Sequence, residues 1–266
     1  MTTQQRTAEV LGDIFAAVNE RIVKHSVTYE EYQSAKDWLI RIGEAGEWPL
    51  FLDVFFEHTV ENLASQRRSG STGCIEGPYY VPGARQLDSP CTLPQRPDEP
   101  GEKLVFSGTV RDLDGTPLPG SIVDIWQADA YGYYSHFHPD PPDGNLRANV
   151  RTDEHGRFEI TTVLPAPYEI PKEGPTGAMI IAAGWHHWRP AHLHMMVRAP
   201  GKRPLTSQLF FAGGNYLDDD VAGAVKPELI LRLDRLDGQD GQDGQDGQDG
   251  LDGHYAAGYD FRLDPV

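Results

Sequence analysis

The stretch Trp188-Arg-Pro-Ala-His-Leu-His-Met-Met-Val197 contains two histidines, His192 and His194, that are separated by one residue. A β-strand points successive side chains to opposite faces, so a strand here would place both imidazoles on the same face of a sheet. The stretch therefore predicts a β-strand that offers two nitrogen atoms to a metal ion. Imidazole suits zinc, copper, iron and nickel alike, and the remaining ligands must identify the metal.

Short β-like runs surround this stretch and predict the rest of the sheet structure from about residue 74 onward. The runs are 104–110, 120–126, 157–163, 191–197, 207–211 and 228–233. Asp112–Gly115 and Asp153–Gly156 have the composition of tight turns between them. Alternating β/α units would need helical patterns between the strands, so the sequence favours an antiparallel sandwich or barrel.

The N-terminal part is helical in pattern. Apolar residues recur at helical spacing between Val10 and Val23, and Thr28 followed by Glu31 has the form of a capping box that opens a second helix. A third, strongly apolar helix is expected to start near Pro49. We therefore predict a mainly β protein with two domains. These are a helical domain at 1–73 and an antiparallel β-sandwich domain at 74–266.

Composition limits the kinds of partner. The chain has 266 residues and a formal net charge of −17, which argues against nucleic acid or an anionic membrane as the partner. Cys74 and Cys91 are the only cysteines, the N-terminus lacks a continuous apolar leader pattern, and no long apolar run exists. We expect a cytoplasmic protein with reduced thiols and no membrane insertion. Its partners should be small molecules or another subunit.

A low-complexity tract repeats Gly-Gln-Asp over residues 238–249. The tract has no apolar residue to bury, so we predict a solvated loop without a catalytic role. Repeated aspartates also allow a calcium-binding interpretation, but the tract lacks the apolar position of β-roll repeats and the ligand pattern of an EF-hand. A surface-loop expansion is the favoured interpretation.

The residues after the histidine pair weaken several metal-site interpretations. A His-x-His-x-Asp hydrolase signature needs an acid where Met196 stands, and a cupin-like site needs a glutamate where Arg198 and Ala199 stand. No Asp or Glu lies between Glu173 and Asp218, so a two-histidine, one-carboxylate triad would need a carboxylate from elsewhere in the fold. Zinc hydrolysis remains an alternative that requires zinc in the purified protein.

Tyrosines are the oxygen donors that remain. Tyr131, Tyr133 and Tyr134 lie in a long loop at 128–149, and Tyr168 lies in a second, proline-rich loop. Phenolate is a hard anionic ligand, so two phenolates with two imidazoles suit ferric iron better than zinc or copper(I). A single tyrosine in such a loop could equally be a packed aromatic residue with its hydroxyl satisfied.

At this point the sequence resembles the intradiol ring-cleaving dioxygenases, the catechol 1,2-dioxygenase group. The resemblance covers nearly the whole chain. It rests on Gly77-Pro-Tyr-Tyr80, Asp124-Ile-Trp-Gln-Ala128, Leu164-Pro-Ala-Pro-Tyr168, Arg189-Pro-Ala-His-Leu-His194 and Leu205-Thr-Ser-Gln208. The family resemblance implies one non-haem Fe(III) per subunit. Carried over residue by residue, it assigns the iron ligands to Tyr134, Tyr168, His192 and His194.

The resemblance also implies the chemistry: a small aromatic diol reacts with O2 and is cleaved between its two hydroxyl-bearing carbons to a cis,cis-muconate. Tyr168 would be the ligand that leaves and takes a catechol proton. Arg189 would supply a fixed positive charge near the ring, and Gln208 would be a polar group behind the ligands. Pairing with a surface carboxylate is the alternative role for Arg189. His186 and His187 are expected to lie outside the iron ligands.

The stretch 43–57 and the short chain resemble the chlorocatechol 1,2-dioxygenase branch most. The substrate-pocket candidates that this branch implies are Leu50, Asp53, Val54, Cys74, Ile75, Pro78, Tyr79, Val221 and Ala222. Plain core packing is the alternative for the apolar members. A hydroxyquinol 1,2-dioxygenase is the alternative within the family, because one added hydroxyl or chlorine is discriminated by contacts that a sequence does not display.

The family further implies a homodimer built on the N-terminal helices, with a lipid bound at the dimer interface. One monomer core shared by the helices and the sheets is the alternative. A non-catalytic β-sandwich binding module is the hypothesis from a different class, since such folds host many functions.

Overall fold

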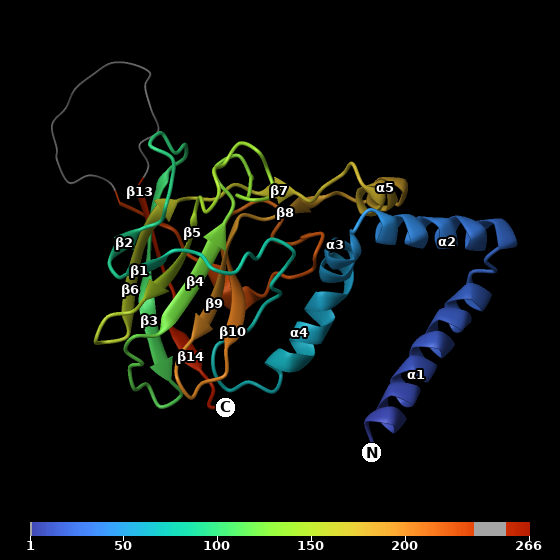
Figure 1. Cartoon of the computed structure of the whole chain (residues 1–266), viewed down its shortest axis with the longest axis horizontal. Helices are drawn as coiled ribbons and strands as arrows, with labels where there is room; N and C mark the ends of the chain where they lie inside the picture. The colour runs from blue at the N-terminus through green and yellow to red at the C-terminus, as the bar shows by residue number, and fades with distance from the viewer. Residues whose placement is uncertain (1, 237–253) are drawn as a thin grey trace. The chain divides into compact units, whose positions relative to one another are not determined.

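The computed structural model describes residues 2–236 and 254–266, and the chain forms two compact units, residues 1–48 and 49–266 (Figure 1). The Gly-Gln-Asp tract at 238–249 lies outside the described residues. A domain boundary at residue 73 stays a prediction. Among the described residues, no helix is long and apolar enough to cross a membrane.

The first unit contains two helices, α1 (Thr3–Lys24) and α2 (Tyr29–Glu44). Both begin with a reciprocal capping box, in which a threonine side chain accepts the N3 backbone N–H and the N3 side chain accepts the cap N–H. The prediction of a capping box at Thr28 and Glu31 is confirmed.

Helical structure continues into the second unit through a π-helical turn. α3 (Trp48–Leu52) leads into η1 (Asp53–Glu57), a π-helix, and then into α4 (His58–Ser65). The third helix expected near Pro49 is confirmed, and the π turn is an addition that the apolar pattern did not indicate. A π turn widens the helix by one residue per turn and is frequent at functional sites.

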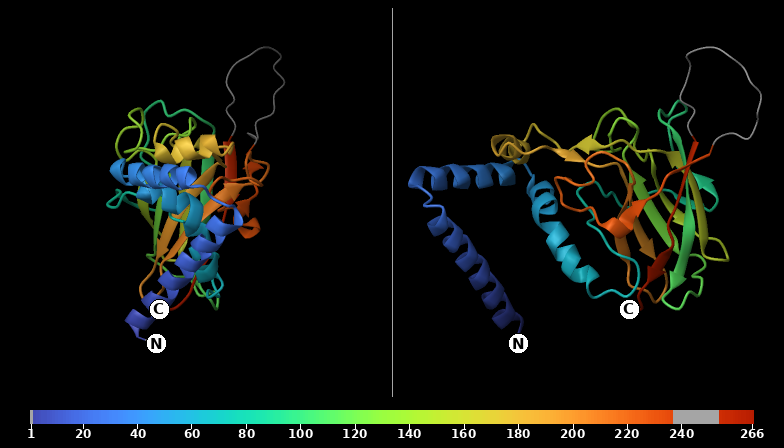
Figure 2. Two further views of the ribbon diagram at one scale, coloured as in Figure 1. Left: turned by 90° about the vertical axis from the view of Figure 1, so that its right-hand side faces the viewer. Right: turned by 180° about the vertical axis from the view of Figure 1, so that it is seen from behind.

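The second unit contains two large sheets that face each other in the views of Figure 2, and a small two-stranded sheet, β7 (Tyr168–Glu169) with β8 (Trp188–Arg189). The first has the order β1 (Gln86–Asp88), β5 (Arg147–Arg151), β4 (Ile122–Gln127), β9 (His192–Arg198), β10 (Leu205–Phe211), β11 (Ile230–Leu231). The second has the order β12 (Asp234–Arg235), β13 (His254–Gly258), β3 (Lys103–Asp112), β6 (Arg157–Val163), β2 (Cys91–Thr92), and β14 (Phe261–Leu263) also pairs with β3.

The central pairs β5–β4–β9–β10 and β3–β6 are antiparallel, which confirms the antiparallel sandwich. The pairs that β1, β2, β11, β13 and β14 make with these strands are parallel. The expected strand at 228–233 is shorter than predicted, because the 3-10 helix η2 (Pro227–Leu229) precedes the two-residue β11. Proline has no backbone N–H to give to a sheet ladder, which favours the helical turn at that point.

Strand β9 separates the core from the histidine pair. Leu193, Met195 and Val197 are fully buried in the hydrophobic core between the two sheets. Alternation along the strand puts His192 and His194 on the opposite face, outside that core. The face that carries the histidines is covered by a second hydrophobic cluster, which includes Leu50, Val54, Tyr79, Trp126, Tyr134, Tyr168, Ile170 and Ile180.

Candidate metal centre and substrate pocket

Four polar side chains converge on the outer face of β9. The Nε2 atoms of His192 and His194 are 2.9 Å apart. The Tyr134 hydroxyl, from the loop after β4, lies 3.1 Å from His194 Nε2 and 3.5 Å from His192 Nε2. Tyr168, in the short strand β7 (Tyr168–Glu169), hydrogen bonds to Tyr134 through its hydroxyl. All four side chains are at most 5% exposed.

His192 presents an unprotonated nitrogen atom to this cluster. His192 Nδ1 lies 2.7 Å from the carbonyl oxygen of Pro190, which can only accept, so Nδ1 carries the proton and Nε2 keeps its lone pair. Burial, followed by the charge of Arg189, lowers the pKa of His192 to about 3. Burial and His192 lower the pKa of His194 in the same direction. Trp126 stacks on His194 with ring centroids 4.8 Å apart and fixes the ring plane.

Burial keeps both tyrosines as neutral phenols. Burial raises the pKa of Tyr134 well above its usual value, and burial also raises the pKa of Tyr168. A trivalent cation among four such donors reverses this preference, because a bound ion is the largest local charge and favours the phenolates. Two neutral imidazoles and two ionisable phenols therefore fit a ferric ion.

The described ranges 2–236 and 254–266 contain no cluster of three or more His, Cys, Asp or Glu side chains that could hold a metal ion. A two-histidine, one-carboxylate triad is thus not formed by the described residues. Among the described residues, Tyr134 and Tyr168 are the candidates for further ligands to a metal bound by His192 and His194.

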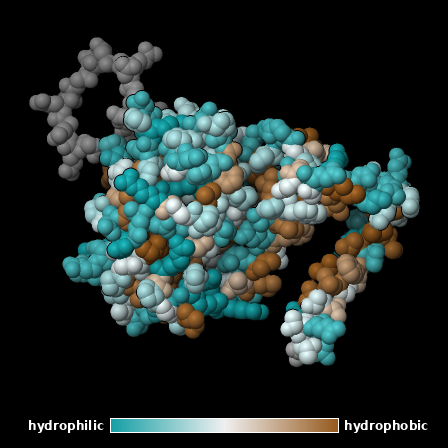
Figure 3. Space-filling model, viewed as in Figure 1, coloured by the Kyte–Doolittle hydropathy of each residue, from teal (hydrophilic) through white to brown (hydrophobic). Residues whose placement is uncertain are grey.

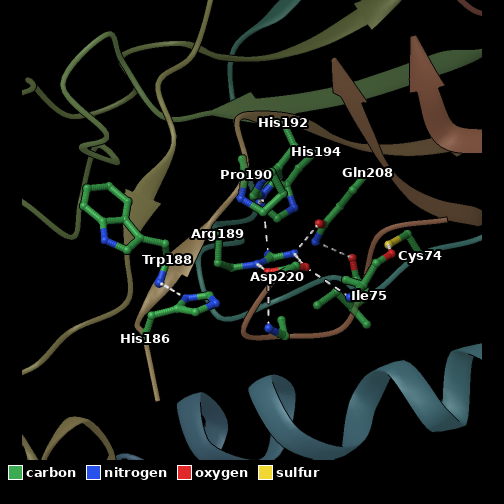
Figure 4. A network of polar contacts seen from close by, with 12 residues as sticks. Cys74, Ile75, His186, Trp188, Arg189, Pro190, His192, His194, Gln208 and Asp220 are labelled. Carbon is green, nitrogen blue, oxygen red and sulfur yellow. Dashed lines mark hydrogen bonds and ion pairs between the residues drawn. The ribbon is translucent and has the colours of Figure 1, made fainter. Parts of the chain in front are cut away.

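Arg189 lies next to the histidine pair (Figure 4). It stands on the short strand β8 (Trp188–Arg189), and its pairing with Tyr168 joins β8 to β7. Its guanidinium forms a two-point ion pair with Asp220, with Nε–Oδ1 and Nη2–Oδ2 distances of 3.0 Å each, and Nη1 lies 3.5 Å from His192 Nε2. Arg189 is 2% exposed, so its partner is a buried carboxylate rather than a surface one.

Asp220 is a site residue that the sequence did not reveal. Beyond holding Arg189, its two oxygens accept the backbone N–H groups of Ala222 and Ala224 at 3.2 and 3.1 Å. Burial alone would raise the pKa of Asp220, but the Arg189 guanidinium and these hydrogen bonds hold it below its usual value. In the sequence Asp220 ends a run of three aspartates, a pattern that normally indicates a solvated loop.

Gln208 continues the polar network. It lies opposite His194 in the β9–β10 register and is fully buried. Its side-chain oxygen accepts from Arg189 Nη2 at 2.9 Å, and its amide nitrogen donates to the carbonyl of Ile75 at 3.0 Å. This amide therefore connects the arginine to the segment around Ile75.

A narrow cavity lies next to the tyrosines, with room for about one water molecule. Six of the nine pocket candidates line it. These are Asp53, Val54, Ile75, Pro78, Tyr79 and Ala222, and they are joined by Tyr168, Ile170 and Arg189. The sequence analysis did not single out Ile170, which continues the proline-rich loop past Tyr168. The wall thus combines the π-helix η1, the segment 75–79 and the loop held by Asp220.

The other three candidates lie near the cavity but do not line it. Leu50 belongs to the hydrophobic cluster over the site, and Val221 packs against that cluster. Cys74 lies in the core between the sheets, where its thiol donates to the Ala224 carbonyl at 3.2 Å.

Asp53 lines the cavity and is influenced by two neighbouring carboxylates, those of Glu57 and Glu76. Burial, together with the charges of Glu57 and Glu76, raises the pKa of Asp53 to about 6. Glu57 accepts the backbone N–H groups of Glu76 and Gly77 at 2.8 and 3.3 Å, which ties the π-helix to the segment that carries Ile75. Asp53 is therefore largely ionised at neutral pH and largely protonated below pH 5.

The raised pKa of Asp53 predicts a pH-dependent stability difference between the wild type and Asp53→Asn. The unfolded carboxyl ionises near pH 3.9, whereas the native one stays protonated to about pH 6. The wild type should therefore lose unfolding free energy relative to the variant as pH rises from about 4 to 6, and the difference should stay constant above that. Urea unfolding of both proteins from pH 4 to 8 measures it; parallel curves throughout would show that Asp53 has an ordinary pKa.

Comparison of the chain with known proteins identifies its family. A family model described as "Dioxygenase" matches residues 75–265, and one described as "Catechol dioxygenase N terminus" matches residues 4–72. The chain is 43% identical over 233 residues to a chlorocatechol 1,2-dioxygenase of Rhodococcus opacus, covering 86% of this chain and 91% of the relative.

Solved structures agree. The crystal structure of 3-chlorocatechol 1,2-dioxygenase from Rhodococcus opacus 1CP superposes with a TM-score of 0.91 at 48% identity, covering 99% of this chain and 100% of that one. The structure of hydroxyquinol 1,2-dioxygenase from Pseudomonas putida DLL-E4 has a TM-score of 0.86 at 29% identity, covering 100% and 94%. The chain therefore belongs to the intradiol dioxygenase family, and within it to the chlorocatechol 1,2-dioxygenase branch.

Proposed function

We propose that this protein is a catechol or chlorocatechol 1,2-dioxygenase, which cleaves the ring of an aromatic diol with O2 to a cis,cis-muconate and incorporates both oxygen atoms. The convergence of two phenols and two neutral imidazoles in a buried cluster carries the proposal. Its membership of the chlorocatechol branch supports the same activity.

We propose Tyr134, Tyr168, His192 and His194 as the ligands of one ferric ion per subunit. When bound, this ion would supply the Lewis acid and the electron acceptor that a chelated catecholate needs to react with O2. Both phenols lose their protons on binding it, so loading should release about two protons per ion.

Tyr168 and Arg189 have the positions that the remaining steps need. Tyr168 lines the cavity and hydrogen bonds to Arg189, so its oxygen can take a proton from an entering diol and keep a cationic neighbour. The Arg189 guanidinium, held by Asp220 and Gln208, stabilises negative charge that develops on the substrate.

The residues that line the narrow cavity suit a planar ring, which would have to widen a space that holds about one water molecule. Val54, Ile75, Pro78 and Ala222 offer apolar surface, and Tyr79 offers an aromatic one. A chlorine substituent is compatible with such walls. A hydroxyquinol substrate is the less supported alternative, since the solved hydroxyquinol enzyme shares 29% identity with this chain against 48% for the chlorocatechol enzyme.

Iron content and visible absorption of the aerobically purified protein test the proposal. A red protein with about one iron per chain is expected, and its tyrosinate-to-iron band should move to longer wavelength when catechol or 4-chlorocatechol is added without oxygen. The relative affinities rank the two diols. A protein that stays colourless after iron reconstitution would contradict the ligand assignment, and a non-catalytic binding module would then be the better description.

We also propose a homodimer that forms through α1. This helix exposes an apolar stripe at helical spacing, visible as hydrophobic side chains along it in Figure 3 and made of Leu11, Ile14, Phe15, Val18, Ile22 and Val23. A second copy of the same stripe is self-complementary and would bury it. A lipid chain at this interface is part of the proposal.

The two cysteines are unpaired, which fits a cytoplasmic location.

Size-exclusion chromatography with light scattering should give about twice the chain mass, and organic extraction should release lipid. Replacing Phe15 and Val18 with aspartate should shift the mass to that of a single chain. A wild-type protein that is monomeric at micromolar concentration would refute the dimer.

A further inference from the structure

A closed turn precedes Tyr134 in the chain. Asp129 is fully buried, and its Oδ1 accepts the backbone N–H groups of Tyr131 and Tyr133 at 2.9 and 3.0 Å. The Asp129 N–H donates to the Tyr133 carbonyl at 3.0 Å, which closes the turn from the other side. One aspartate therefore fixes the backbone up to the residue before Tyr134.

The same turn is bound to the segment that carries Tyr168. The Asp129 carbonyl accepts from Ala166 N at 3.1 Å, two residues before Tyr168. Gly132 has a φ of +85°, and a Cβ atom built on it would lie 2.9 Å from the Cβ of Tyr168. The backbones that carry the two tyrosines are thus in direct contact at this turn.

Arg96 anchors the turn from outside. Its Nη2 donates to Asp129 Oδ2 at 2.8 Å and to Glu99 Oε1 at 2.7 Å, and its Nε donates to Glu99 Oε2 at 3.0 Å. Both carboxylates are at most 1% exposed, so each needs this cation. At the far end of the loop, Leu146 N donates to the Pro94 carbonyl at 2.7 Å, close to Arg96 in sequence.

We propose that the Arg96–Asp129 ion pair is a positioning device that sets the place of the Tyr134 hydroxyl relative to that of Tyr168, and through it the affinity of the site for ferric iron. The proposal rests on the tyrosine ligands of the proposed function. Neither Arg96 nor Asp129 touches the four ligand atoms; both act through the turn. Outer partners that orient ligands change metal affinity when they are removed.

Asp129→Asn tests the device with little change in volume. An amide oxygen can still accept from Tyr131 and Tyr133, but its NH2 group then faces the Arg96 donors, and the turn must shift. Iron affinity should fall about 10–100-fold. The tyrosinate band should move, and in the metal-free protein the amides of Tyr131 and Tyr133 should exchange with deuterium faster. Arg96→Lys keeps the charge but not the fork of donors, and its iron affinity should lie between wild type and Asp129→Asn.

Val110→Ala is the matched control, because Val110 is fully buried in β3, away from the turn. It should lower the melting temperature without changing the band, the iron affinity or the exchange at Tyr131 and Tyr133. If Asp129→Asn behaves in the same way while the wild type is red, the positioning role is wrong. If the wild type itself binds no iron, the proposed function fails and the inference fails with it, whatever the exchange data show.

Discussion

Replacing His194 with alanine is expected to abolish iron binding and ring cleavage. His194 Nε2 lies within 3.1 Å of both His192 Nε2 and the Tyr134 hydroxyl, so its loss removes the nitrogen that the other donors surround. The fall in kcat/KM should exceed about 100-fold, the upper range for partners that act only from outside the ligand shell. Metal analysis, visible absorption and oxygen uptake measure the three consequences, and far-UV circular dichroism reports whether the fold is retained.

His186→Ala is the control for this experiment. His186 lies in the same part of the chain and pairs with Asp219 at 3.3 Å, but it is not one of the converging residues. It should retain iron and most of the activity. A His194→Ala protein with a full complement of iron and an unchanged band would show that the ligand set is wrong.

Arg189→Met should be both unstable and inactive, and the two defects should separate in a double variant. Methionine removes the partner of a buried carboxylate, and breaking a buried ion pair from one side costs about 3–5 kcal/mol. The Arg189→Met/Asp220→Asn protein should recover much of that stability because no unpaired carboxylate remains. Its kcat should stay low, since the positive charge beside the substrate is still missing.

The pH dependence of the stability deficit shows whether the unpaired Asp220 carboxylate, rather than a nonspecific loss of packing, destabilises Arg189→Met. In the wild type, the charge of Arg189 outweighs burial and keeps the native pKa of Asp220 below its usual value. The ionised Asp220 therefore adds to the unfolding free energy above about pH 4, and this contribution is lost as pH falls through the native pKa. Without Arg189, burial raises the pKa of Asp220, and protonation then relieves the cost. The deficit of Arg189→Met should therefore be largest at neutral pH and shrink on acidification. Urea unfolding at pH 5 and pH 8 measures it, and a deficit that is equal at both would contradict the role of Asp220.

The sequence predicted those features of the fold that depend on neighbouring residues, namely tight turns and the alternation of side chains along a strand. The turn at Asp112–Gly115 closes with a hydrogen bond from Gly115 N to the Asp112 carbonyl at 3.0 Å, and Asp153–Gly156 closes in the same way. The alternation around His192 correctly predicted a strand with both imidazoles on one face. The sequence did not predict which strands pair in parallel with the outer strands, because the register between distant segments depends on the whole fold.

The sequence predicted the site residues that belong to recognisable motifs. Family motifs indicated the four converging residues, and the structure brings them together. Asp129 and Asp220 had no such signal, because an aspartate in a polar loop has the same local pattern whether it is buried or solvated. Each carboxylate is buried against a distant arginine. Arg96 lies 33 residues before Asp129, and Arg189 lies 31 residues before Asp220.

Strand β9 and the cavity walls differ in how freely they can change during evolution. Its core face is packed between the sheets and its other face holds the histidines, so most substitutions in this strand would cost stability or disturb the proposed iron site. The cavity walls come instead from η1, the segment 75–79 and the loop at 220–222. Substrate preference can thus diverge through mutations in separate segments of the chain, while the chemistry of the centre is inherited unchanged.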